Sequence, residues 1–160
     1  MSSRPTVQEY SSYFETYVAL VPDGDIQDIL TRQQQTTNEL FSNLSEERAN
    51  TRYAPEKWSI KESYRLLRIA RGDKTPLTGY DQDELMNGAS FSNCSLSELL
   101  EDYNSVRRAT LTLLKGLSGE AWSRTGIVNS SESTANAWAY ILAGHERHHV
   151  NVVLKKYLNQ

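Results

Sequence analysis

The chain has 160 residues, of which 38% are hydrophobic and 23% charged, and its net charge is −3 at pH 7. This composition is typical of one globular domain over residues 1–160. The 17 basic residues are interspersed with 20 acidic ones, which argues against a nucleic-acid partner. No apolar run reaches the roughly 20 residues that cross a membrane. The single cysteine, Cys94, cannot form an internal disulfide, so we expect a cytoplasmic protein.

Hydrophobic residues recur at helical spacing in five segments. These segments are Val7–Leu20, Asp25–Leu44, Ser59–Arg71, Ser95–Leu117 and Thr134–Leu158. Capping boxes begin two of them, with Ser59 paired to Glu62 and Ser95 to Glu98. The stretch Ser118–Ser133 is polar, and no segment gives a clear strand pattern. We therefore predict an all-α domain, an antiparallel four-helix bundle with a short extra N-terminal helix.

The predicted helix Ser59–Arg71 is short for such a bundle. Its length is about 20 Å, whereas the other three long helices reach about 30 to 37 Å. Either the loop Lys74–Cys94 fills the space beside it, or a piece of helix is absent.

The long helices are expected to have distinct faces. On the last helix, 100° per residue places one stripe toward the core, consisting of Trp138, Leu142, His145, His149 and Val152. His148 lies about 60° to one side of this stripe, and Glu146 and Arg147 point elsewhere. On the third helix the charged residues are expected to form a solvated face, made of Glu101, Asp102, Arg107 and Arg108.

The last helix holds all three histidines of the chain. His145 and His149 are one turn apart, so both rings can present a nitrogen to one divalent ion at about 2.0–2.1 Å. A pair of core histidines bonded to neighbouring polar groups is the alternative. The residues also match His-Glu-x-x-His of the zincin peptidases, in which Glu146 would be the general base. However, no His, Asp, Glu or Cys follows His149 as a third ligand.

Five longer stretches occur in order along nearly the whole chain. They are Val-Pro-Asp-Gly-Asp-Ile at 21–26, Tyr-Ala-Pro-Glu-Lys-Trp-Ser-Ile-Lys-Glu at 53–62, Leu-Leu-Arg-Ile-Ala-Arg-Gly-Asp-Lys-Thr-Pro-Leu at 66–77, Gly-Tyr-Asp-Gln-Asp at 79–83, and Ala-Tyr-Ile-Leu-Ala-Gly-His-Glu-Arg-His-His at 139–149. Together they resemble the DinB-like family, YfiT-type subgroup. The resemblance implies a four-helix bundle with a buried zinc or nickel ion held by three histidines. It also implies a metal-dependent hydrolase or thiol S-transferase that acts on a small molecule.

The resemblance assigns His145 and His149 as two of the metal ligands, and His148 is then a supporting residue or proton shuttle. The third histidine of the family follows the segment that ends at Glu62, where this chain has none. Three explanations stay open. The chain has a true deletion, or Glu62 replaces the missing ligand, or further residues of the molecule stand between Glu62 and Ser63 and the backbone is discontinuous there.

A non-enzymatic function is the alternative to metal chemistry. A shortened helix would expose an apolar groove that a partner could fill. In that case the domain is a metal-free association module, and a homodimer is its simplest form.

Overall fold

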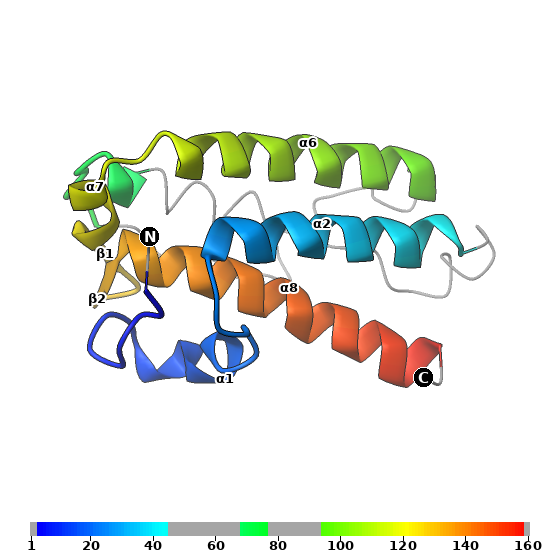
Figure 1. Ribbon diagram of the computed structural model, residues 1–160. Coiled ribbons are helices and arrows are strands. Elements are labelled where there is room, and N and C mark those ends of the chain that lie inside the picture. The colour runs from blue at the N-terminus through cyan, green and yellow to red at the C-terminus, as the bar shows by residue number, and fades with distance from the viewer. Residues whose placement is uncertain (1–2, 45–67, 77–93, 159–160) are drawn as a thin grey trace.

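The structure is a computed structural model that describes residues 3–44, 68–76 and 94–158. In this part of the chain three long helices lie side by side (Figure 1), namely α2 (Ile26–Ser42), α6 (Leu96–Lys115) and α8 (Ala135–Tyr157). Their bounds agree closely with three predicted segments, and the mostly helical class is confirmed. No helix of the described residues is long and apolar enough to cross a membrane.

The second predicted helix, Ser59–Arg71, falls almost entirely outside the described residues. Only its end is described, and residues 68–70 are helical. Glu62, the step from Glu62 to Ser63 and most of the predicted loop Lys74–Cys94 also lie outside them.

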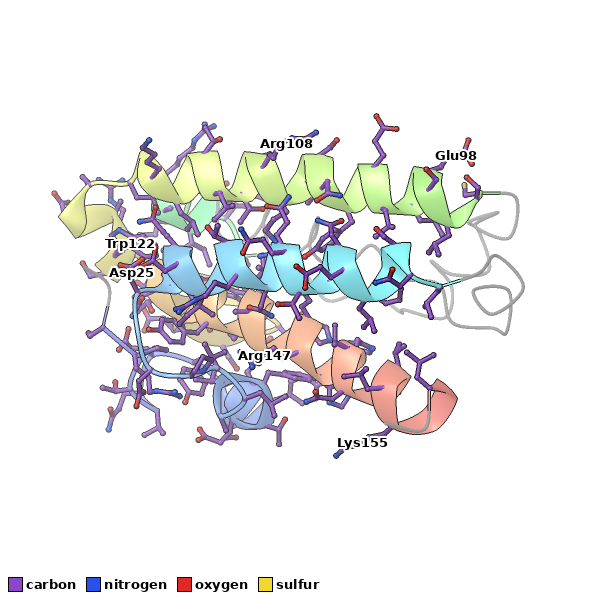
Figure 2. The ribbon with its side chains drawn as sticks, turned by 45° about the vertical axis from the view of Figure 1, so that its right-hand side comes forward. Asp25, Glu98, Arg108, Trp122, Arg147 and Lys155 are labelled. Atoms are coloured by element: carbon purple, nitrogen blue, oxygen red, sulfur yellow. The ribbon has the colours of Figure 1, made fainter. Side chains whose placement is uncertain are left out.

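Side-chain caps fix where the long helices begin. The carboxylate of Asp25 accepts hydrogen bonds from two backbone amides in the first turn of α2. Ser95 and Glu98 form the predicted capping box at the start of α6, each side chain bonding the backbone of the other. Figure 2 shows Asp25 and Glu98 at these two helix starts. The hydroxyl of Thr134 accepts the Ala137 amide at 3.0 Å and so caps α8.

The N-terminal segment is less helical than the predicted Val7–Leu20. It contains a single 3-10 turn, η1 (Ser12–Phe14), followed by the four-residue helix α1 (Glu15–Val18). The earlier residues form turns instead, since the Thr6 amide donates to the Glu9 side chain at 2.8 Å. Such local side-chain bonds compete with helix formation.

The prediction that the chain has no strand is wrong for the end of Ser118–Ser133. After the short helix α7 (Gly119–Ser123), the strands β1 (Thr125–Val128) and β2 (Ser131–Thr134) pair antiparallel, with Val128 opposite Ser131. Asn129 and Ser130 form the turn at φ 49° and 63°. Two residues with positive φ match the twist of a two-residue hairpin.

The first half of α8 is buried on all sides. Every residue from 135 to 144 is buried, because α1 packs against α8 from one side and α2 from another (Figure 1). The approach of α1 is close at Gly144, where an added Cβ would lie 1.9 Å from the carbonyl oxygen of Tyr17. A glycine is therefore required at this contact.

The apolar core of the described residues has two parts. The larger cluster surrounds Trp138 near the hairpin and includes Val18, Ile26, Leu30, Ile69, Leu114, Val128 and Ala143. The smaller cluster lies at the other end of the long helices and contains Phe41, Leu96 and Val153. Between the two clusters, each long helix contributes polar side chains to the interior. We call this middle level the polar layer, with Gln33, Thr37, Tyr103, Arg107 and Glu146 as members.

The close contact at Gly144 gives a first prediction. Gly144→Ala should lower the free energy of unfolding by about 1–3 kcal/mol, because α1 must move away from α8 to admit the methyl group. Urea unfolding of the variant and the parent measures this difference. Gly119→Ala is the matched control, since a Cβ there meets nothing within 4 Å. Equal stability of Gly144→Ala and the parent would contradict the described packing of α1.

Candidate functional site

The three histidines lie on α8 just after its fully buried half. The ring centroids of His145 and His149 are 5.1 Å apart, and those of His148 and His149 are 4.9 Å apart. His145 and His149 are half-buried, whereas His148 is exposed. The two predicted ligands are therefore neighbours, and the predicted core stripe of α8 becomes partly open from His145 onward.

Tyr17 of α1 closes one side of this group of rings. Its ring centroid lies 4.5 Å from that of His145 and 5.5 Å from that of His148. No local pattern predicts this contact, because it depends on how α1 packs against α8 at Gly144. The aromatic spacing of Tyr10, Tyr13, Phe14 and Tyr17 was the only available signal that this segment has a packing face.

The environment of His149 keeps its ring neutral. Burial, together with the neighbouring rings of His145 and His148, lowers the pKa of His149 to about 3. A neutral imidazole is the form that binds a metal ion. His149 therefore needs to lose no proton at neutral pH before it can act as a ligand.

The separation of the two rings suits a shared ion. Two imidazoles that bind one tetrahedral ion through nitrogens at about 2.0–2.1 Å have ring centroids about 5 Å apart, and His145 and His149 are at 5.1 Å. Within the described ranges, no group of three or more His, Cys, Asp or Glu side chains is arranged to hold a metal. A third ligand would have to come from elsewhere, and Glu62 lies outside those ranges.

Glu146 is directed into the interior between α2, α6 and α8, which corrects the expectation that it points away from the core. Its Oε1 accepts hydrogen bonds from the hydroxyls of Tyr103 at 2.7 Å and Thr37 at 2.9 Å. Its Oε2 accepts a hydrogen bond from Nη2 of Arg107 and forms an ion pair with it. Two helices, α2 and α6, thus hold one carboxylate of α8.

Arg107 is the main error in the predicted solvated face of α6. Its side chain is only 1% exposed, whereas Glu101, Asp102 and Arg108 are exposed as expected. Burial lowers the pKa of the Arg107 guanidinium, but an arginine stays charged in proteins. A buried cation needs a counter-ion, and Glu146 provides it.

Helical spacing could have identified Arg107. It continues an apolar stripe on α6 at intervals of three and four, formed by Leu96, Leu100, Tyr103, Arg107, Thr110 and Leu114. The same helical spacing places Glu146 on one face of α8 with Ala139, Ala143 and Val153. For Arg107 the charge of the side chain was given more weight than its position, and for Glu146 the predicted core face of α8 was too narrow.

Further hydrogen bonds extend the polar layer toward the surface. Nε2 of Gln33 donates to the carbonyl of Ala143 at 3.0 Å. Asn104 of α6 exchanges hydrogen bonds of 2.7 and 2.8 Å with Asn38 and accepts one of 2.7 Å from Gln34. Polar contacts therefore join α2 to both α6 and α8 at one level.

This arrangement disfavours the zincin interpretation. A general base of that class needs a carboxylate that can take a proton from a water molecule. The carboxylate of Glu146 instead accepts bonds from Thr37, Tyr103 and Arg107. Each of these donors stabilises its charged form, so Glu146 is held as the partner of Arg107.

The ion pair gives a second prediction. Glu146→Leu should lower the free energy of unfolding by about 3–5 kcal/mol, because it leaves the charge of Arg107 buried and unpaired. The double variant Arg107→Met/Glu146→Leu should recover most of this loss. Urea unfolding of the parent, both single variants and the double variant forms the thermodynamic cycle. Additive losses in the double variant would show that the two side chains do not interact.

The neutral ring of His149 gives a third prediction, for protein kept free of metal with a chelator. The folded-state pKa of His149 is about 3, below the ordinary value near 6.5. Between these two pH values the His149 ring is protonated in the unfolded chain but not in the folded one. The free energy of unfolding should therefore fall as the pH drops below about 6.5. Between pH 7.5 and 5, His149→Gln should reduce this fall by roughly 1 kcal/mol, allowing for the half exposure of the ring. An equal fall in the parent and the variant would exclude a buried neutral ring.

Comparison with known proteins agrees with the resemblance noted in the sequence. A family model described as the DinB superfamily matches residues 29–153. This match covers α6 and most of α2 and α8, including the three histidines and the polar layer. Neither the curated proteins nor the solved structures give a significant match. The chain belongs to the DinB superfamily.

Proposed function

We propose that this DinB-superfamily domain binds one divalent transition metal through His145 and His149 and acts as a hydrolase or thiol S-transferase on a small molecule. The observation that carries the proposal is the ring pair, with centroids 5.1 Å apart on one helix. The lowered pKa of His149, about 3, supports it, because the ring is ready to bind a metal at neutral pH.

The donor set suits zinc or nickel, since imidazole nitrogen is a good ligand for both ions. Two protein ligands do not complete a site of this kind. In this proposal the third ligand comes from the predicted helix Ser59–Arg71, which would complete a four-helix bundle with α2, α6 and α8. Glu62 is the candidate residue. A carboxylate oxygen in place of a third imidazole is an accepted zinc ligand.

The bound ion would supply Lewis acidity and would lower the pKa of a bound water or thiol. The residues of this chain would orient that chemistry. His145 and His149 would bind the ion from one face of α8. Tyr17 covers the His145 ring on one side. His148 is exposed beside His149, so its ring can pass a proton between the site and solvent.

The fourth prediction concerns metal content. Untagged protein loaded with zinc or nickel and then desalted should retain about one equivalent, measured by mass spectrometry. His145→Ala and His149→Ala should each lose it, because one imidazole is left. Asn151→Ala, an exposed change on the same helix, should keep the metal.

Absence of bound metal from the loaded parent would refute this proposal. The metal-free association module would then be the function to test, by light scattering over a range of concentrations. A strict monomer at high concentration would count against that alternative as well.

A further inference from the structure

Glu146 lies between the two proposed ligands in sequence and is held by side chains of two other helices. Thr37 reaches it from α2, and Tyr103 and Arg107 reach it from α6. Its side chain is 14% exposed and that of Arg107 only 1%. The carboxylate is therefore fixed inside the bundle from more than one direction.

Helix geometry connects this fixed point to the rings. Successive residues turn by about 100°, so Glu146 lies about 100° around α8 from His145 and about 60° from His149. A rotation of α8 about its axis would move all three side chains by the same angle. The bonds that hold Glu146 thus also set the direction in which both rings point.

The arrangement is not the one that stability alone would select. Nε and Nη1 of Arg107 and Oε1 of Gln33 are buried without a hydrogen-bond partner among the described residues. Leaving buried polar groups unpaired costs free energy of folding. Apolar side chains of similar volume in place of a buried ion pair often give equal or greater stability. A charged hydrogen bond adds direction, which an apolar contact lacks.

We infer that Glu146 is a positioning residue of the histidine pair. Its carboxylate, held by Thr37, Tyr103 and Arg107, sets the rotation of α8 and so aims His145 and His149 at one ion. The predicted effect on metal affinity rests on the proposed metal site. The geometric part, the orientation of the rings on α8, can be measured without a metal.

The test uses the double variant Arg107→Met/Glu146→Leu, which removes the directional bonds without leaving either charge unpaired. The control is Leu114→Ala, a cavity-forming change in the larger apolar cluster on the same helix as Arg107. Zinc affinity and the visible spectrum of the cobalt-loaded protein report on the site. Contacts between the Tyr17 and His145 ring protons, measured by NMR in metal-free protein, report on ring orientation.

The double variant should bind zinc about 10- to 100-fold more weakly, as when groups that orient metal ligands are removed. Its cobalt spectrum should change, and the contact between Tyr17 and His145 should weaken. Leu114→Ala should keep the affinity, spectrum and contact of the parent while losing stability. An equal loss of affinity in Leu114→Ala would mean that general destabilisation explains the effect and would overturn the inference.

Failure of the two proposals can be told apart. If the parent binds zinc and the double variant binds it equally well with an unchanged spectrum, the positioning role is refuted and the metal site stands. If the parent binds no metal, the proposed function fails and the NMR contact decides the inference. A weakened contact in the double variant alone then supports the positioning role, and an unchanged contact refutes it.

Discussion

The ion pair between Arg107 and Glu146 is the interaction on which the arrangement of the long helices depends. A guanidinium that is 1% exposed and has lost its counter-ion costs several kcal/mol, a large share of the roughly 5–15 kcal/mol that stabilises a typical domain. Helices α6 and α8 must therefore stay where this pair can form. The two apolar clusters then fill the interior between the long helices on either side of the polar layer.

A single run of five residues serves both the interior and the candidate site. Within His145–His149, Glu146 faces α2 and α6, while the rings of His145 and His148 lie beside Tyr17 on another part of the helix surface. The period of 3.6 residues per turn separates the two faces. The candidate site on one face of α8 is in this way tied to packing on another face.

Periodicity and caps were enough to predict α2, α6 and α8, because each has apolar residues that recur at helical spacing and a polar residue that caps its start. The hairpin was missed because its strands have four residues each and its turn, Asn129-Ser130, lacks the glycine that usually indicates a hairpin. The histidine pair followed from spacing alone. Tyr17 did not, since its place is set by a tertiary contact at Gly144 that no local pattern encodes.

The docking of the N-terminal segment on α8 also constrains the order in which the molecule can fold. Glu9 accepts a hydrogen bond from Thr134, 125 residues later, and the carbonyl of Ser3 accepts one from Asn136, 133 residues later. The entropic cost of closing so long a loop increases little with further length. Contacts between residues this far apart in the sequence nevertheless lower the folding rate. During synthesis on the ribosome the first residues wait for the last helix to emerge. Tyr17 therefore reaches the histidines at a late step, after the helix that carries them exists.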